Sequence, residues 1–242
     1  MRPGKYNKRK IHTVQPLQAN FRFERDMTSV ARNWLAQQGL TTKAEFYTPW
    51  GVCDLVGISL EQDRVRQRLN LGQSKAVGPL LRVEILHRLP EDRFITLTGL
   101  ARLYKNLLTP EELRVQLDHL MAGKFARVNE RGAFQKLNGW VPLHQRIVAL
   151  ELKLTRVQDA LRQAVSNLAF AEESFVGLPS GLAERVANSD CAGEFRNSGV
   201  GIVSVSADKC VVLLPSRPRT LADPVMQMHC VERFWRTRPK DN

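Results

Sequence analysis

The spacing of hydrophobic residues predicts a helix and a hairpin near the start of the chain. Apolar side chains recur at helical spacing across residues 21–39, and Gly39 is a typical helix C-terminal residue. Strands are expected over residues 43–48 and 52–60, because β-branched and apolar residues flank the turn Pro49-Trp50-Gly51. The chain is therefore expected to begin with a helix followed by two antiparallel strands.

The pattern changes after this hairpin. Residues 61–77 are polar and rich in Arg and Gln, and we expect a linker or an exposed segment there. Residues 78–139 then predict three helices, near 80–86, 96–105 and 109–123, followed by a strand, a turn and a strand over 124–137. The third helix has a clear start signal, formed by Thr109 as cap, Pro110 in the first turn and Glu112 as the partner in a capping box.

Residues 145–155 predict a central strand. Val148, Leu150 and Leu152 alternate with Ile147 and Ala149, so both faces are apolar and both are expected to be covered. The segments that follow read as a helix (157–170), a strand (174–178), a helix (180–190), two strands (200–205 and 210–214) and a last helix (225–235). This order predicts an α/β fold with helices packed on a mixed sheet.

Composition adds a basic charge to this picture. The chain has 36 Lys and Arg against 24 Asp and Glu, a formal net charge of +12, which attracts polyanions such as nucleic acid. Some proteins are simply basic, and that interpretation stays open. Residues 1–18 form a basic arm without acidic residues, which either lies along phosphates or is a solvated tail. It carries Arg2, Lys5, Lys8, Arg9 and Lys10.

Other features of the composition argue against several classes of protein. The four cysteines form no C-x-x-C pair, so a zinc ribbon or a thioredoxin-like redox site is poorly supported. The basic N-terminal residues have no apolar run behind them, and no apolar stretch is long enough to span a membrane. We therefore expect a cytoplasmic protein with reduced cysteines and no membrane partner.

Three charged residues fall inside apolar strands. Glu151 and Lys153 are two apart on a predicted strand, so their side chains are expected to leave the same face. Asp54 lies among apolar residues on another predicted strand, where an isolated carboxylate is unusual. If the two strands are neighbours, the two carboxylates would repel each other and would gain from a shared Mg²⁺ or Mn²⁺ ion. Glu-x-Lys also occurs by chance, as an exposed strand edge or an ion pair.

Gly51-Val-Cys-Asp54 followed by Glu151-Leu-Lys153 resembles the PD-(D/E)XK nuclease superfamily, over roughly residues 20–60 and 144–214. The resemblance implies that Asp54 and Glu151 are metal ligands and that Lys153 is the catalytic lysine. It implies an assisting role for Gln163, within Arg162-Gln163-Ala164 on the following helix. Many members also use an acidic residue of the first helix, for which Glu24 is the candidate here, although Glu in a first turn also complements the helix dipole.

Two features depart from the family pattern. Pro49 lies in the turn rather than directly before Asp54, and the interval between Asp54 and Glu151 is unusually long. The segment of three helices and a hairpin fills this interval and resembles a winged helix-turn-helix. We therefore divide the chain into a basic arm (1–18), a discontinuous restriction-endonuclease-like domain (19–74 and 141–242) and an inserted winged-helix lobe (75–140).

The two resemblances together predict a Mg²⁺-dependent DNA endonuclease. The third helix would read DNA through Arg114 and Gln116, and the hairpin residues Arg127, Arg131 and Lys136 would meet phosphates or the minor groove. A winged helix used for protein contacts stays open, and so does a homodimer or a larger complex. The alternative function is a nuclease-fold regulator or assembly subunit that binds DNA without cutting it. RNA is less favoured as a substrate because no RNP-like aromatic motif is present.

Overall fold

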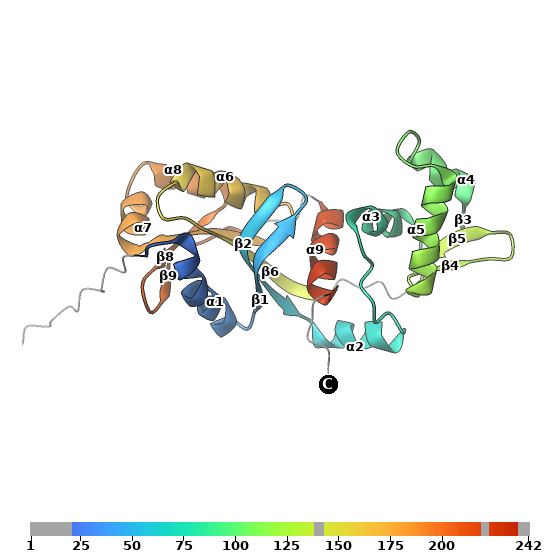
Figure 1. The fold of residues 1–242 in the computed structure, drawn as a ribbon, viewed down its shortest axis with the longest axis horizontal. Coiled ribbons are helices and arrows are strands. Elements are labelled where there is room, and N and C mark those ends of the chain that lie inside the picture. Colours follow the sequence, from blue (N-terminus) through green and yellow to red (C-terminus); the bar gives the residue numbers. More distant parts are fainter. Residues whose placement is uncertain (1–20, 138–142, 219–222, 237–242) are drawn as a thin grey trace, which may run out of the picture.

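A six-stranded mixed sheet forms the centre of the larger part of the molecule (Figure 1). The computed structural model describes residues 21–137, 143–218 and 223–236. Within them the strand order is β1-β2-β6-β7-β8-β9, with parallel pairing of β6 to β7 and of β7 to β8 and antiparallel pairing elsewhere. The strands are β1 (Thr41–Thr48), β2 (Gly51–Leu60), β6 (His144–Leu152), β7 (Glu173–Pro179), β8 (Gly201–Val205) and β9 (Cys210–Leu214). The predicted α/β class with a mixed sheet and flanking helices is confirmed.

Helices cover both faces of this sheet. On one face, the short 3-10 helix η1 (Glu24–Met27) and α1 (Thr28–Gln37) pack Met27, Ala31 and Leu35 against Leu55 and Leu150. The other face is covered by four helices, whose apolar residues form two clusters with the opposite side of the strands. They are α6 (Val157–Asn167), α7 (Ser180–Ala187), α8 (Cys191–Ser198) and α9 (Pro224–Arg236). This double cover explains why β6 is apolar on both sides.

A smaller lobe is inserted between β2 and β6 and lies at one end of the molecule (Figure 1). A three-stranded sheet of order β3-β5-β4 closes it, and its core contains Leu100, Leu113, Leu117, Leu120 and Phe134. Met228 of α9 belongs to the same cluster, so the lobe shares its core with the last helix. The lobe elements are α3 (Leu80–Arg88), β3 (Ile95–Thr96), α4 (Leu97–Leu103), α5 (Pro110–Ala122), β4 (Ala126–Val128) and β5 (Ala133–Lys136).

The start signal of α5 forms as its sequence predicts. The Thr109 hydroxyl accepts from Glu112 N at 3.2 Å, and the Glu112 carboxylate accepts from Thr109 N at 2.8 Å, so two amide groups at the helix start are satisfied. Leu80, the first residue of α3, packs against the cluster of Phe46 and Trp235 beneath α9 rather than against the core of the lobe.

The expectation of a linker over residues 61–77 is wrong, since α2 (Gln62–Asn70) forms there. Its inward position is taken by Arg68, which is fully buried, so the apolar periodicity that announces a helix is missing. The Arg68 guanidinium donates to Glu232 of α9 at 2.5 and 2.9 Å and lies over the rings of Phe125 and Trp235. This arginine joins α2, α9 and the lobe. The helix α8 was also not predicted.

The predicted basic arm of residues 1–18 lies outside the described residues. Within the described ranges, no helix has the length and apolar character needed to cross a membrane.

Candidate active site

In the β1–β2 hairpin, the alternation of side chains between the two faces of the sheet is interrupted at Glu45 and Asp54. Cys53 and Phe46 belong to the cluster beneath α9, whereas Leu55 and Ala44 belong to the cluster beneath α1. Residues two apart on one strand normally share a face, so the alternation is broken on both strands at the same place. The cause is visible at Glu45, whose φ of 48° is in the left-handed region that non-glycine residues seldom adopt.

Asp54 sits at this break, where the recorded pairing of β2 with β6 ends at Leu55 opposite Leu150. Beyond that pair, a side chain replaces the backbone carbonyl as hydrogen-bond acceptor: Asp54 Oδ2 accepts from Leu152 N at 2.8 Å. The same oxygen accepts from Lys153 Nζ at 3.3 Å. Within the described residues, Oδ1 accepts no hydrogen bond, so one oxygen of Asp54 remains available to a ligand.

Lys153 follows directly after β6 and is held between carboxylates. Its side chain is 8% exposed, and Nζ lies 3.3 Å from Asp54 Oδ2 and 3.5 Å from Glu24 Oε2. Burial lowers the pKa of Lys153, but the charges of Asp54, Glu24 and Glu151 outweigh it, so the net pKa is raised. The ammonium group therefore stays protonated at neutral pH, and it acts as a cation rather than as a base.

Glu151 is the most buried group of the set, at 1% exposure. Its Oε1 accepts from Asn167 Nδ2 of α6 at 2.6 Å, while the buried Oε2 finds no partner among the described residues. Burial, reinforced by the charge of Asp54, raises the pKa of Glu151 to about 7, although hydrogen bonds from Asn167 and Cys53 and the charge of Lys153 oppose the shift. An unpartnered carboxylate oxygen in this position is costly unless a proton or a cation joins it.

Two cavities are lined by these residues and their neighbours. One of about 500 Å³ holds Asp54 at its wall, and a smaller one of about 180 Å³ holds Glu151. The three charged groups thus meet around the ends of β2 and β6, but the two carboxylates face different cavities. The first cavity is lined by Glu24, Arg25, Thr28, Ala44, Glu45, Asp54 and Leu152; the second is lined by Thr48, Trp50, Gly51, Val52, Glu151, Arg162, Gln163, Ser166 and Asn167.

The remaining predicted site residues fall near this centre. Glu24 reaches it through Lys153, and Gln163 lines the smaller cavity, where its side chain hydrogen-bonds to no described residue. Among the described residues, no three His, Cys, Asp or Glu side chains are gathered as a ready metal site. The sequence reasoning missed Asn167 and Glu45. Asn167 could have been found, because it lies four positions after Gln163 and so on the same helix face.

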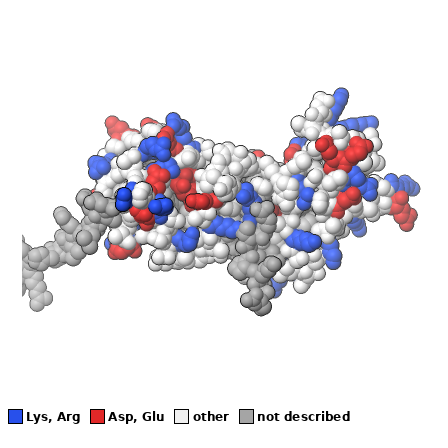
Figure 2. Space-filling view, in the orientation of Figure 1, with Lys and Arg blue, Asp and Glu red and all other residues white. Residues whose placement is uncertain are grey.

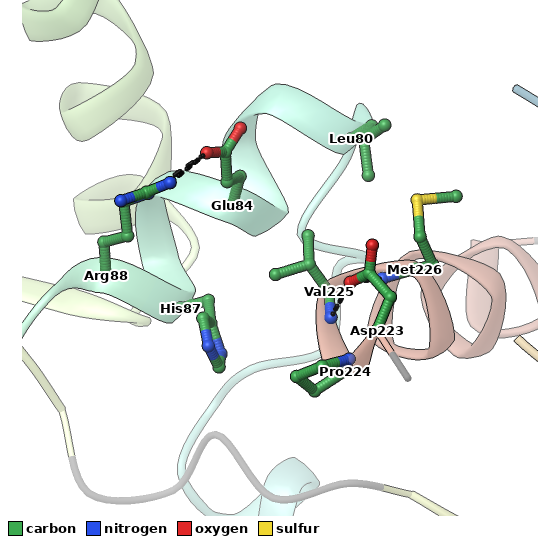
Figure 3. Close-up of a pocket in the computed structure, with 8 residues that line it drawn as sticks. All are labelled: Leu80, Glu84, His87, Arg88, Asp223, Pro224, Val225 and Met226. Carbon is green, nitrogen blue, oxygen red and sulfur yellow. Dashed lines mark hydrogen bonds and ion pairs between the residues drawn. The ribbon is translucent and has the colours of Figure 1, made fainter. Parts of the chain in front are cut away.

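A larger cavity of about 610 Å³ lies away from these residues, between α3 and the start of α9 (Figure 3). Its two carboxylates are already engaged, since Glu84 pairs with Arg88 at 3.0 Å and Asp223 Oδ1 accepts from Val225 N at 3.0 Å. We place the candidate site at the ends of β2 and β6 because that region combines a buried unpartnered carboxylate with a buried cation.

The predicted DNA-contacting residues of the lobe differ in whether they already form hydrogen bonds or ion pairs with other residues of the protein. Arg114 pairs with Asp118 at 3.0 Å, and Gln116 accepts from Arg82 Nε at 3.1 Å. Arg127 donates twice to Gln135, at 2.9 and 2.7 Å, whereas Arg131 stands on the exposed β4–β5 turn. Lys136 is mostly buried, and its Nζ lies 3.3 Å from Glu91 and 3.5 Å from His87 O.

Comparisons of this chain with models of protein families, with curated proteins and with solved structures give no match.

Proposed function

We propose that this protein is a metal-dependent nuclease that hydrolyses phosphodiester bonds in DNA. The observation that carries the proposal is a buried Glu151 oxygen, without a hydrogen-bond partner among the described residues, in the same region as a buried Lys153 ammonium group that is ion-paired with Asp54. The same proposal assigns the six-stranded sheet to the restriction-endonuclease-like architecture, and the lobe of α3, α4, α5 and its small sheet to a winged helix.

The residues fit a divalent cation. Glu151 Oε2 has no hydrogen-bond partner among the described residues, and both hydrogen bonds to the Asp54 carboxylate go to Oδ2 rather than Oδ1; hard oxygen ligands of this kind suit Mg²⁺ or Mn²⁺. Mg²⁺ commonly takes only one or two carboxylates and completes its shell with water and phosphate oxygens, so a preformed cluster of three acidic residues is not required. When bound, such a cation would polarise the phosphodiester and offset the charge that develops on it.

The protein groups supply position and charge. Lys153, held by Asp54 and Glu24 and kept protonated, would stabilise the negative charge on the non-bridging phosphate oxygens and orient the attacking water. Asn167 fixes the Glu151 carboxylate through Oε1, so Oε2 keeps one direction. Gln163, on the same cavity wall, would donate to the substrate phosphate.

DNA would be held by charge in addition to the site. The net charge of +12 supplies a sequence-independent attraction to phosphates. Arg131 on the exposed turn is the lobe residue best placed for such contacts, because Arg127 donates to Gln135 and Lys136 is occupied by Glu91 and His87.

The test is incubation of the full chain with supercoiled, linear and single-stranded DNA, with Mg²⁺, Mn²⁺ or EDTA. Cleavage is expected only with metal. Glu151→Ala and Lys153→Ala should each lower the rate by about 100-fold or more, the loss typical when one charge-stabilising group is removed. Lys209→Ala, on the exposed β8–β9 turn, is the matched control and should cut normally. Cleavage by Glu151→Ala at the wild-type rate would exclude the proposed mechanism, in which Glu151 holds the cation.

A second candidate function is a DNA-binding protein of the same architecture that does not cut. It is favoured by one observation: Asp54 and Glu151 line different cavities, and Asp54 is already bonded to Lys153 and to Leu152 N. The same assay separates the two functions, since a pure binder would retard DNA on a gel without converting it in any metal.

A further inference from the structure

The tip of the β1–β2 hairpin presents apolar side chains to solvent beside the candidate site. Thr48 pairs with Gly51, so only Pro49 and Trp50 form the loop, and the Thr48 hydroxyl donates to Gly51 O at 3.0 Å. Tyr47 is 58% exposed, and Trp50 is 42% exposed. The space-filling view accordingly shows a largely uncharged surface where Figure 1 draws this hairpin (Figure 2). The short loop and the fixed φ of Pro49 restrict the backbone that carries Trp50. A ligand that contacts Trp50 therefore costs little conformational entropy.

Trp50 is also part of the smaller cavity of the candidate site. It shares that cavity with Glu151, whose buried Oε2 has no partner among the described residues, and with Arg162 and Gln163 of α6. One face of the indole leans on Phe170, with the ring centroids 6.2 Å apart, which braces the ring against the sheet. Trp50, Arg162 and Glu151 therefore line one cavity.

We propose that Trp50 stacks on an unpaired nucleobase of the DNA strand whose phosphate enters the candidate site. The inference rests on the proposed function and specifies its substrate: single-stranded DNA, or a duplex with an unpaired end or gap. An exposed indole offers a flat apolar face that any base can stack on. Gln163 offers a donor for the phosphate, and Arg162, one of whose nitrogens donates to Asp159, offers its other guanidinium nitrogens.

An exposed indole favours unpaired DNA over duplex DNA as the ligand. In a duplex both faces of a base are already stacked, so an indole gains contact only where the base is free or displaced. The tip itself is largely uncharged, but a cation lies next to it, since the Arg233 guanidinium is 6.0 Å from the Tyr47 ring centroid, and the chain as a whole carries +12. A positively charged track with exposed aromatic rings is the arrangement that binds single strands without regard to sequence.

The test measures binding of the full chain in EDTA, without cleavage. The probes are a labelled oligothymidylate of about 15 nucleotides, within the range of single-strand site sizes, and a blunt duplex of the same length. Wild type should prefer the single strand. Trp50→Ala should weaken single-strand binding by about tenfold while leaving duplex binding nearly unchanged, and Trp50→Phe should retain most of the affinity because a ring remains.

Val212→Ala is the control, because Val212 is a hydrophobic residue of similar exposure on β9, outside both the lobe and the candidate site. It should leave the ratio of the two affinities at the wild-type value. An unchanged ratio in Trp50→Ala, or equal wild-type affinity for both probes, overturns the proposal and leaves the tip as a surface for a protein partner. Because no cleavage is measured, a loss of single-strand binding in Trp50→Ala stands even if the protein cuts no DNA in Mg²⁺.

Discussion

Lys153 Nζ lies 3.3 Å from Asp54 Oδ2, although 99 residues separate the two along the chain. The contact forms where the backbone pairing of β2 and β6 stops and the Asp54 carboxylate bonds to the next amide of β6. The inserted lobe lies between these two residues in sequence, yet the strands close up across its base. The Asp54–Lys153 ion pair, located where the pairing of two covered strands ends, is the reason that we place the candidate site in this region.

The stability of the protein is expected to fall as the pH rises toward 8. Burial raises the pKa of Glu151 to about 7, above its ordinary value of 4.5, so the folded state holds a proton that the unfolded state releases. Such a group favours folding fully below its unfolded pKa, and this contribution is lost as the pH rises through the folded pKa. The loss is at most about 3 kcal/mol, at roughly 1.4 kcal/mol per pKa unit.

Urea denaturation at pH 5, 6, 7 and 8 in EDTA measures this change. Glu151→Gln cannot ionise and should flatten the decline between pH 5 and 8, whereas Glu130→Gln on the exposed β4–β5 turn should not. Mg²⁺ at pH 8 should restore stability to wild type but not to Glu151→Gln, because only the carboxylate attracts the cation strongly. A wild-type curve that is level with pH would contradict the assigned burial of a protonated Glu151.

Glu45 should tolerate glycine and reject a β-branched residue. Its φ of 48° costs an ordinary side chain about 1–2 kcal/mol, and a glycine removes that cost while losing chain entropy of similar size. Glu45→Gly is therefore expected to be within about 1 kcal/mol of wild type, and Glu45→Val to be destabilised by about 2 kcal/mol. Thermal unfolding checks both, with Thr41→Val at the exposed start of β1 as control.

The same pair of variants tests whether the break in alternation positions Asp54. Because Glu45 lines the cavity of Asp54 and lies at the break, Glu45→Val should also lose metal-dependent cleavage, and Glu45→Gly should keep it. Equal activity in the two variants would show that the left-handed conformation has no part in placing the carboxylate.

The ion pair between Arg68 and Glu232 should be costly to break from one side. Both side chains are almost fully buried, and Glu232 Oε2 also accepts from Val77 N at 2.7 Å. Arg68→Met is expected to cost about 3–5 kcal/mol, because it leaves Glu232 charged and buried without its partner. The double variant Arg68→Met, Glu232→Gln should recover a large part of that loss. A double-mutant cycle by chemical denaturation measures it, and strictly additive effects would exclude the coupling.

The lobe should contribute to DNA binding in two separable ways. Replacing Arg127 and Arg131 by Ala is expected to weaken all duplexes about equally and to flatten the dependence on salt, since phosphate contacts release counterions. Replacing Arg114 and Gln116 by Ala should reduce discrimination between two unrelated duplexes more than overall affinity. Salt titrations of both double variants measure this. No change in either would point to protein contact as the role of the lobe.

The sequence by itself determined the main elements and the candidate residues. The helical and alternating periodicities predicted α1, the β1–β2 hairpin, β6 and the elements that follow except α8, because apolar faces must be buried. Asp54, Glu151 and Lys153 were found because charged groups inside apolar strands conflict with that rule. The helix α2 was missed for a related reason: its buried position holds Arg68, whose charge is paired with that of Glu232, 164 residues away.

Only the tertiary structure decided how the charged groups of the site are arranged. Strand alternation predicts that Glu151 and Lys153 leave the same face, but β6 ends at Leu152, and the long Lys153 side chain extends to Asp54 and Glu24. Glu151 remains on the strand and meets Asn167 of α6. The left-handed Glu45 and the partner of Arg68 are equally invisible to a local pattern, because each depends on contacts between segments far apart in the chain, and the energy of those contacts outweighs local preference.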